Sequence, residues 1–370
     1  MPCDYQGLPH PGILSLKPYI PGKSADELAE EQGLTDIIKL ASNENPLGCS
    51  PMVITALSKL SAQQISTYPI AANHPLRKKL SLKLAVNNDM LILGNGSDTL
   101  IPLIQNCFAL HRKKHIITHD HAFIAYSIYA KSLGIPVVTT PLLPNWQVDI
   151  DAMIAACNEK TACIFLATPN NPTGLLVSQT NIERLLKNIP ETTLLVLDEA
   201  YYEYVPVVEK LKATALLATY PNLVILRTFS KAYGLAGLRL GFAIANRDII
   251  ALLYRVSPPF AVNEAALIAA HAALDDPTFI QHTVMANATG LQQLQQGFTA
   301  LGLSYLPTTA NFISVDFKKD AMPLYQNLLQ RGIILRPLYP YNMPNYLRVT
   351  IGTEEQNSRF LDALKDGLYT

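Results

Sequence analysis

The sequence predicts an α/β protein with a large, mostly parallel sheet and a second, smaller α+β domain. From about residue 90 to residue 256, short apolar runs alternate with helical patterns, which is typical of a parallel sheet covered by helices. After Pro258 the pattern changes to two long helical runs, then short strands and a final helix. With 370 residues, of which 49% are apolar, the chain can bury one large core and one smaller core. We therefore expect an N-terminal arm with part of the small domain at 1–45, the large domain at 46–256 and the small domain at 257–370.

The composition argues against several classes of function. The formal net charge is +0 and the pI is about 7.1, whereas a nucleic-acid partner requires a basic face. No apolar run approaches the roughly 20 residues of a membrane-spanning helix. The first residues lack the basic and apolar regions of a signal peptide. The five cysteines are odd in number and form no CxxC pair, so we expect a reducing, cytoplasmic setting, with no membrane or nucleic-acid partner.

The N-terminal part is predicted to be an arm followed by short elements. Prolines and glycines punctuate the first 35 residues. A short strand at 37–41 then leads into the polar loop Ser42-Asn-Glu-Asn-Pro-Leu-Gly48. Pro51 is expected to open a helix, because proline fits the first helical turn. Tyr68 lies in a loop before a helical run at 76–86.

A glycine-rich turn follows the first strand of the large domain. Met90-Leu-Ile-Leu leads into Gly94-Asn-Gly96-Ser97-Asp98, and an apolar helical pattern then runs to about Leu110. Backbone N–H groups and the helix dipole at such a turn favour an anion such as phosphate. The third glycine of a dinucleotide fingerprint is missing, and an ordinary strand–helix turn remains the alternative.

Four histidines crowd the next stretch without suggesting a metal site. They straddle a predicted strand at 115–118 and the loop after it, and no cysteine or carboxylate pattern completes a zinc site. We therefore expect no metal. Phe123 starts a helix that runs to Gly134, and it is interpreted either as a core residue or as an aromatic platform at a strand end.

Two further strands are expected to end in polar groups at one edge of the sheet. After a short strand at 136–140, the apolar run 162–167 is typical of a buried parallel sheet, and it ends in a rigid loop containing Asn171. The run 194–197 delivers Asp198, with Tyr201 three residues later, and a carboxylate there calls for a cationic or protonated partner. Ser178 is expected to cap one helix, and another is expected at 207–219.

The stretch Arg227 to Phe242 combines a lysine, a hydroxyl and an arginine in a glycine-punctuated loop. A strand-like run at 223–228 leads into Ser230 and Lys231, and Arg239 follows eight residues after the lysine. This combination suits a phosphate held by serine and arginine, with an amine placed to form an imine. All of these polar groups fall at predicted strand-to-helix transitions, where ligands bind in sheets of this kind.

The small domain is expected to contribute two arginines. Helical runs at 262–274 and 278–301 precede short strands at 311–317, 333–335 and 347–351, and a helix begins at Glu354. Arg336 and Arg348 lie at strand ends in apolar surroundings, so each is interpreted either as a surface charge or as an anion-binding group.

Taken together, these motifs resemble the fold-type-I pyridoxal-phosphate aminotransferases (class II), and within them the histidinol-phosphate aminotransferases. The resemblance covers almost the whole chain. It rests on Leu40-Ala-Ser-Asn-Glu-Asn-Pro-Leu-Gly48, Gly94-Asn-Gly-Ser-Asp98, Ala122-Phe-Ile-Ala-Tyr126, Pro169-Asn-Asn-Pro-Thr-Gly174, Asp198-Glu-Ala-Tyr201, Thr228-Phe-Ser-Lys-Ala-Tyr-Gly-Leu-Ala-Gly-Leu-Arg239 and Leu347-Arg-Val-Thr-Ile-Gly352. It implies a seven-stranded sheet in the large domain and pyridoxal 5′-phosphate as the cofactor.

The resemblance also implies a role for each cofactor residue. Lys231 would bind the cofactor covalently and shuttle the proton, and Asp198 would pair with its pyridine nitrogen. Asn171 and Tyr201 would hydrogen-bond the ring oxygen, and Phe123 would stack on the ring. The phosphate would lie among Gly96, Ser97, Asp98, Ser230 and Arg239. Phe123 replaces a frequent tyrosine, and Thr99 a frequent glutamate.

At the substrate end, the resemblance implies one site for both a carboxylate and a phosphate, since the substrates are histidinol phosphate and glutamate or 2-oxoglutarate. Bidentate arginine can hold either anion. Arg348 would be the main anion-binding residue and Arg336 its helper. Asn45, Tyr19 from the arm and Tyr68 from the partner subunit of a homodimer would complete the shared site.

Two other functions stay open on the sequence alone, and a third is disfavoured by it. An aromatic-amino-acid aminotransferase would share Lys231, Asp198 and Arg348. A threonine-phosphate decarboxylase has the same fold and a phosphate-bearing substrate. A ligand-sensing regulator would need an added DNA-binding segment, for which the arm is too short and too rich in proline.

Overall fold

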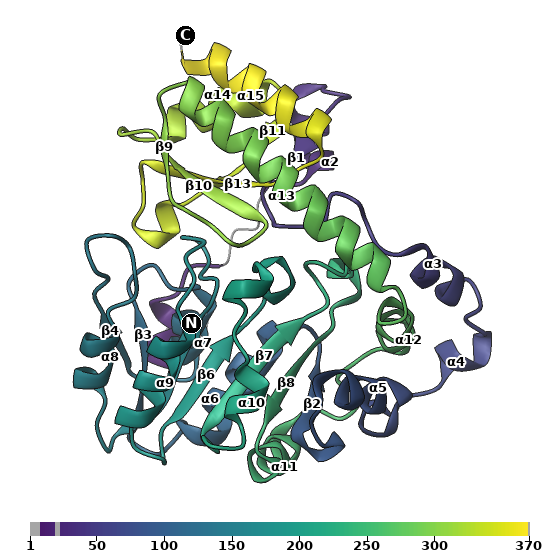
Figure 1. The fold of residues 1–370 in the computed structure, drawn as a ribbon, viewed down its shortest axis with the longest axis vertical. Helices are drawn as coiled ribbons and strands as arrows, with labels where there is room; N and C mark the ends of the chain where they lie inside the picture. The colour runs from purple at the N-terminus through teal and green to yellow at the C-terminus, as the bar shows by residue number, and fades with distance from the viewer. Residues whose placement is uncertain (1–7, 19–22, 369–370) are drawn as a thin grey trace, which may run out of the picture.

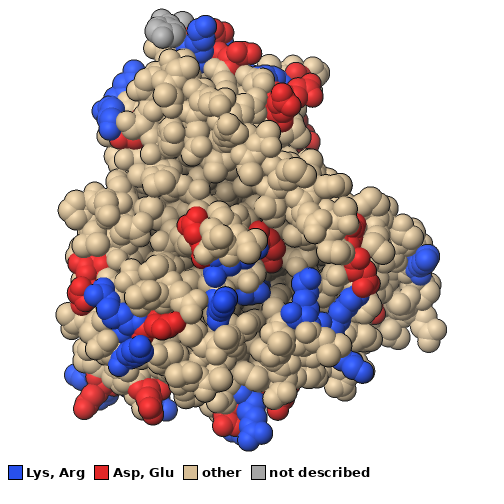
Figure 2. Space-filling model, viewed as in Figure 1, with Lys and Arg blue, Asp and Glu red and all other residues tan. Residues whose placement is uncertain are grey.

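A computed structural model describes residues 8–18 and 23–368 of the chain. Two lobes are visible in Figure 1: a large lobe built on one sheet, and a smaller lobe that contains the C-terminal helices. The face shown in Figure 2 carries acidic and basic side chains intermixed, in keeping with the formal net charge of +0. In the described residues, no helix is both long enough and apolar enough to cross a membrane.

The large lobe contains a seven-stranded sheet in the order β2-β8-β7-β6-β5-β3-β4. All neighbouring strands are parallel except β8, which runs antiparallel to both β2 and β7. The mostly parallel seven-stranded sheet is therefore confirmed. The strands are β2 (Leu91–Gly94), β3 (His115–His119), β4 (Val137–Thr140), β5 (Thr161–Ala167), β6 (Leu194–Asp198), β7 (Leu223–Thr228) and β8 (Gly241–Ala245).

Helices cover both faces of this sheet, because its strands are apolar on both sides. On β5, Ile164 and Leu166 belong to one core, and Cys163 and Phe165 belong to the other. The second core is closed by α6 (Leu100–Phe108), α7 (Ala125–Ser132) and α11 (Arg247–Val256). The first is closed by α3 (Pro51–Leu57), α5 (Pro75–Leu84), α8 (Ile150–Ala156), α9 (Gln179–Asn188), α10 (Ala213–Leu216) and α12 (Glu264–Ala273). The predicted caps are present: Pro51 opens α3, and the Ser178 side chain accepts the N–H of Asn181.

The small lobe is an α+β layer with its own core. Its antiparallel sheet has the order β12-β13-β10-β9, and a short parallel pair joins β1 to β11. Phe298, Val315 and Phe360 are among its buried residues. Its elements are α2 (Ala25–Gln32), β1 (Ile38–Lys39), α13 (Pro277–Ala300), β9 (Ser304–Tyr305), β10 (Phe312–Asp316), α14 (Met322–Gln330), β11 (Ile333–Ile334), β12 (Arg336–Pro337), β13 (Tyr346–Thr350) and α15 (Glu354–Leu368). The exact boundaries near 45 and 256 stay predictions.

One predicted helix is wrong in extent. In place of a helix over 207–219, the chain forms a 3-10 turn at Val207–Glu209 and the single-turn helix α10. The Val207 and Val208 side chains are 85% and 94% exposed, so the first turn of this segment has no apolar side chain packed on the core, whereas Leu211, Ala213 and Leu217 further along are buried in it. Without such packing, the β-branched residues do not hold a longer helix.

Candidate active site

The carboxyl ends of the neighbouring strands β5, β6 and β7 bring Asn171, Asp198 and Lys231 to one cavity of about 460 Å³. Because the three strands are parallel, the loops after them emerge at the same edge of the sheet. Nine of the ten residues predicted to hold the cofactor line this cavity: Ser97, Asp98, Phe123, Asn171, Asp198, Tyr201, Ser230, Lys231 and Arg239.

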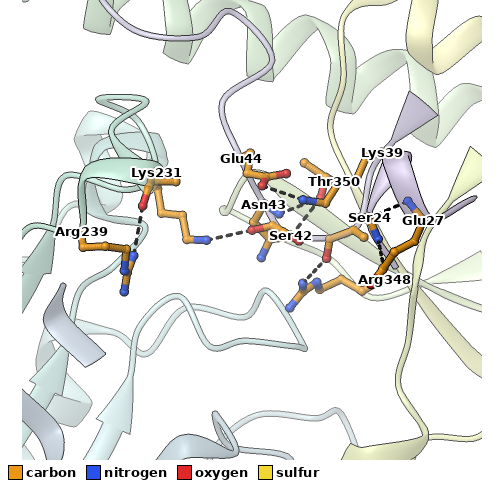
Figure 3. Close-up of polar contacts among 12 residues, drawn as sticks. Ser24, Glu27, Lys39, Ser42, Asn43, Glu44, Lys231, Arg239, Arg348 and Thr350 are labelled. Atoms are coloured by element: carbon orange, nitrogen blue, oxygen red, sulfur yellow. Dashed lines mark hydrogen bonds and ion pairs between the residues drawn. The ribbon is translucent and has the colours of Figure 1, made fainter. Parts of the chain in front are cut away.

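The Lys231 amine lies where it can be uncharged. Its Nζ donates to the Ser42 carbonyl at 3.0 Å and lies 5.8 Å from the centre of the Tyr201 ring. Figure 3 shows the side chain reaching across to the Ser42 backbone. Burial, together with the nearby Arg348 guanidinium, lowers the Lys231 pKa to about 7. A neutral amine at this position can act as a nucleophile and as a proton acceptor.

Asp198 ends β6 as a buried carboxylate, 6% exposed. Its Oδ2 accepts the Tyr126 hydroxyl at 2.8 Å, and its Oδ1 accepts the Ala200 N–H at 3.1 Å. Burial raises the Asp198 pKa to about 6, and these two hydrogen bonds oppose the rise. Among the described residues no salt bridge engages Asp198, so a cationic ring nitrogen would supply the charge partner that burial calls for.

The glycine turn after β2 forms a cradle beside Arg239. Gly96 has φ +80°, and a Cβ there would lie 2.5 Å from Arg239 Nη2, so only glycine allows this approach. Arg239 Nη1 lies 3.5 Å from Ser230 Oγ. The Thr99 hydroxyl donates to the Gly96 carbonyl at 3.1 Å, which closes the turn. Arginine, two serines and a tight backbone turn are the groups that hold a phosphate.

The two groups predicted to contact the ring oxygen are each held by a second residue. The Asn171 amide oxygen accepts Arg348 Nη1 at 2.5 Å, so its NH₂ is the group left for a ligand. The Tyr201 hydroxyl accepts Asn43 Nδ2 at 2.9 Å. Burial raises the Tyr201 pKa to about 12, which keeps the phenol protonated. Both residues can therefore donate a hydrogen bond into the cavity.

Phe123 forms part of the cavity wall beside Tyr126, with the two ring centres 5.5 Å apart in an edge-to-face arrangement. The ring borders both the core and the cavity, so the core and platform interpretations of Phe123 are compatible. Phenylalanine offers an apolar ring face to a planar ligand but no hydroxyl.

Arg336 and Arg348 are directly opposite each other on β12 and β13. Arg348 is 6% exposed; besides Asn171, it donates to the Ala41 carbonyl at 2.7 Å. Two like charges at opposite positions of an antiparallel pair are unfavourable, so an anion held between them would stabilise the pair. The burial of Arg348 argues against a surface charge for that residue.

Two other predicted substrate residues, Asn45 and Tyr68, do not line the cavity. Asn45 Nδ2 donates to the Ala232 carbonyl at 2.9 Å and to Thr283 Oγ1 at 3.1 Å. Tyr68 is 77% exposed and stacks on Phe260, with ring centres 4.5 Å apart. Tyr19 lies outside the described residues. The described residues contain no group of three or more His, Cys, Asp or Glu side chains that could hold a metal.

Sequence reasoning missed three residues that support the site. Tyr126 holds Asp198, Asn43 holds Tyr201, and Tyr129 donates to Asp98 Oδ2 at 2.5 Å. Asn43 and Tyr126 fall inside motifs that carried the resemblance, but their partners are more than 70 residues away in the chain. For the two tyrosines, helical spacing was the available signal, since Phe123, Tyr126 and Tyr129 recur every three residues, just before and within α7.

Comparisons with known proteins point to one family. The family model for aminotransferase class I and II matches residues 35–364. The chain is 56% identical over 366 residues to histidinol-phosphate aminotransferase 2 of Legionella pneumophila (strain Lens), with 99% of both chains covered. It is 43% identical over 363 residues to histidinol-phosphate aminotransferase 2 of Pseudomonas aeruginosa, with 98% of both covered. The crystal structure of histidinol-phosphate aminotransferase from Sinorhizobium meliloti in complex with pyridoxal-5′-phosphate is similar, with a TM-score of 0.87, 26% identity and 97% of both chains covered.

Proposed function

The chain belongs to the aminotransferase class I and II family, and from this premise we propose that it exchanges an amino group between L-histidinol phosphate and 2-oxoglutarate/glutamate, as a step of L-histidine biosynthesis. The cofactor of this family is pyridoxal 5′-phosphate. The observation that carries the proposal is the position of Lys231, Asp198 and the phosphate cradle around a single cavity. The histidinol-phosphate substrate is supported by the names of relatives that match the full chain.

The residues fit the cofactor from end to end. Ser97, Ser230 and Arg239 would hold its phosphate, Asp198 its ring nitrogen, and Asn171 and Tyr201 its ring oxygen. When bound, pyridoxal phosphate supplies the electron sink that makes the substrate Cα–H bond acidic. The neutral Lys231 amine would take the proton from that carbon and carry it to the cofactor. Asp198, already held by Tyr126, keeps a negative charge beside the ring nitrogen.

Both substrates present an anion, and the small lobe supplies a matching cation pair. Arg348 reaches the cavity wall through Asn171, and Arg336 is beside it on the neighbouring strand. A guanidinium binds carboxylate and phosphate in the same planar, bidentate manner. We propose that the glutamate carboxylate and the histidinol phosphate occupy this position in turn.

We propose further that the enzyme is a homodimer with shared active sites. The region between residues 47 and 70 projects from the edge of the large lobe as α3 and α4 (Ala62–Ser66) (Figure 1). It exposes large apolar side chains: Leu47, Met52, Ile54, Ile65, Tyr68 and Ile70. A second copy of the chain would cover these side chains and bring Tyr68 to the substrate phosphate of the neighbouring site, together with Tyr19.

We propose a cytoplasmic enzyme without nucleic-acid or membrane partners. The four described cysteines are free thiols, as expected in a reducing compartment. The zero net charge provides no basic field for a phosphate backbone.

The test is a substrate panel on the purified protein with added pyridoxal phosphate. With 2-oxoglutarate as acceptor, glutamate formation is expected to be much faster from histidinol phosphate than from phenylalanine. A clear preference for phenylalanine would identify an aromatic-amino-acid aminotransferase. Release of carbon dioxide from threonine phosphate, without a keto acid, would identify a decarboxylase. Either result would reject the proposed substrate.

A further inference from the structure

The segment 41–45 links the two lobes across the candidate site. Its Ala41 carbonyl accepts Arg348, its Ser42 carbonyl accepts Lys231, and its Asn43 side chain donates to Tyr201. In Figure 3, Lys231 approaches this segment from one side, and Arg348 and Thr350 lie on the other. Asn43 contacts the site with its side chain, whereas Ala41 and Ser42 contact it with their backbone carbonyls.

Hydrogen bonds from neighbouring residues hold the buried Asn43 backbone in place. It is 1% exposed, and its backbone has φ +56°, a left-handed conformation that asparagine tolerates better than most residues. Its N–H donates to Thr350 Oγ1 at 2.9 Å, and its carbonyl accepts Asn311 Nδ2 at 3.0 Å. Thr350 ends β13 and Asn311 directly precedes β10, so the small lobe anchors the Asn43 backbone.

The same contacts fix the orientation of the Asn43 amide. Thr350 Oγ1 already accepts the Asn43 N–H, so its own hydrogen is donated to Asn43 Oδ1 at 3.2 Å. The NH₂ group is thereby left facing the Tyr201 hydroxyl. Since the Tyr201 oxygen accepts this donor, its O–H hydrogen is available to another acceptor. Tyr201 lines the cavity, so that acceptor can be a ligand.

We propose that Asn43 is a positioning residue that orients the Tyr201 hydroxyl as a hydrogen-bond donor to the ring oxygen of the cofactor. This inference rests on the proposed function, because it concerns the same cofactor site. Donation from Tyr201 withdraws charge from the ring oxygen and so destabilises the proton on the nitrogen that joins Lys231 to the cofactor. The charged and titratable groups around Tyr201 are Arg348, Tyr341, Asp198, Lys231, Tyr126 and Tyr204, and the test leaves all six unchanged.

The test is a pH titration of the visible absorption of the cofactor-loaded protein. Asn43→Gly keeps the left-handed backbone and removes the amide. Asn43→Asp keeps the shape, replaces the donor with an acceptor that turns the hydroxyl toward itself, and adds a negative charge that raises the midpoint in the same direction. We expect both variants to raise the pH midpoint of this absorption change by about one unit, the equivalent of one lost hydrogen bond. Asn342→Gly is the matched control, because Asn342 has the same φ of 56° and is exposed outside the site; its midpoint should equal that of the unmodified protein.

A double-mutant cycle separates an effect through Tyr201 from a general loosening of the site. Tyr201→Phe should raise the midpoint by a similar amount, and adding Asn43→Gly to it should raise it no further. Midpoints of the Asn43 variants equal to that of the unmodified protein, or fully additive shifts in the double variant, would overturn the inference while leaving the proposed function intact. If the unmodified protein shows no visible band with pyridoxal phosphate, the proposed function and the inference fail together.

Discussion

Lys231 illustrates how burial converts an ordinary lysine into a reactive one. The loop after β7 places its amine beside Tyr201, near the positive charge of Arg348, and against the Ser42 carbonyl. Desolvation disfavours the ammonium form, and so does a neighbouring guanidinium. The amine is therefore neutral over much of the physiological pH range without any specific base beside it.

This pKa predicts the pH dependence of cofactor uptake. Only the neutral amine attacks the cofactor aldehyde, and the Lys231 pKa is lowered to about 7. The rate at which the visible band appears after pyridoxal phosphate is added to the cofactor-free protein should rise about tenfold per pH unit below 7 and level off above it. Stopped-flow absorption measures this rate. A rate that keeps rising to pH 10 would show that the lysine has an ordinary pKa.

Asp198 shows what the sequence could and could not reveal about single residues. A carboxylate at the end of an apolar run indicated a functional acid that needs a partner. The structure supplies a hydroxyl, from Tyr126, and we propose that the cofactor supplies the cationic partner. The tyrosine could not be assigned from the sequence, because its contact with Asp198 depends on how α7 packs over the sheet.

At the scale of elements, the sequence predicted the strands better than the connections between them. Continuous apolar runs identified β5, β6 and β7, because a strand that is buried on both faces needs apolar residues at nearly every position. The failed helix at 207–219 was less constrained, since Val207 and Val208 in its first turn are exposed and only its later residues pack on the core. The pairing of Arg336 with Arg348 was equally inaccessible, because register between strands is a tertiary property.

The pairing of β12 with β13 makes the arginines a joint anion site, and this can be tested by truncation. Arg348→Ala should weaken the binding of glutamate and of histidinol phosphate by roughly 2–4 kcal/mol each, since the lost group is a buried charge partner. Steady-state kinetics with both substrates measures the effect.

Two variants serve as controls for the Arg348 experiment. Arg348→Lys keeps the charge without the bidentate fork and should restore only part of the binding. Arg336→Ala should have a smaller effect, because Arg336 is less buried than Arg348. If Arg348→Ala impaired one substrate and spared the other, the two anions would occupy different positions.

At the scale of the whole molecule, the candidate site lies where the two lobes meet. The large lobe supplies the cavity, and the small lobe supplies Arg348 and the anchors of Asn43. The Tyr68 ring is mostly exposed within its own chain. Among the aromatic rings described, it stacks on that of Phe260 alone. A second copy of the chain would explain both this exposure and the apolar side chains around it.

A shared active site predicts that two inactive variants restore each other. Lys231→Ala removes the nucleophile, and Tyr68→Ala removes the residue contributed to the neighbouring site. Unfolding and refolding an equal mixture should yield mixed dimers in which one of the two sites is intact, so roughly a quarter of the unmodified activity should return. Each variant refolded alone provides the control. Activity no higher than the average of the two separate variants would indicate that Tyr68 acts within its own chain or not at all.

The central claim is that Lys231 is the residue that binds the cofactor covalently. Reducing the pyridoxal-phosphate-loaded protein with borohydride would fix the cofactor to its lysine, and peptide mapping by mass spectrometry would locate it. We predict one modified peptide, carrying the adduct at Lys231, and no stoichiometric adduct in Lys231→Ala. A full equivalent of adduct on another lysine, or none on the unmodified protein, would contradict the account.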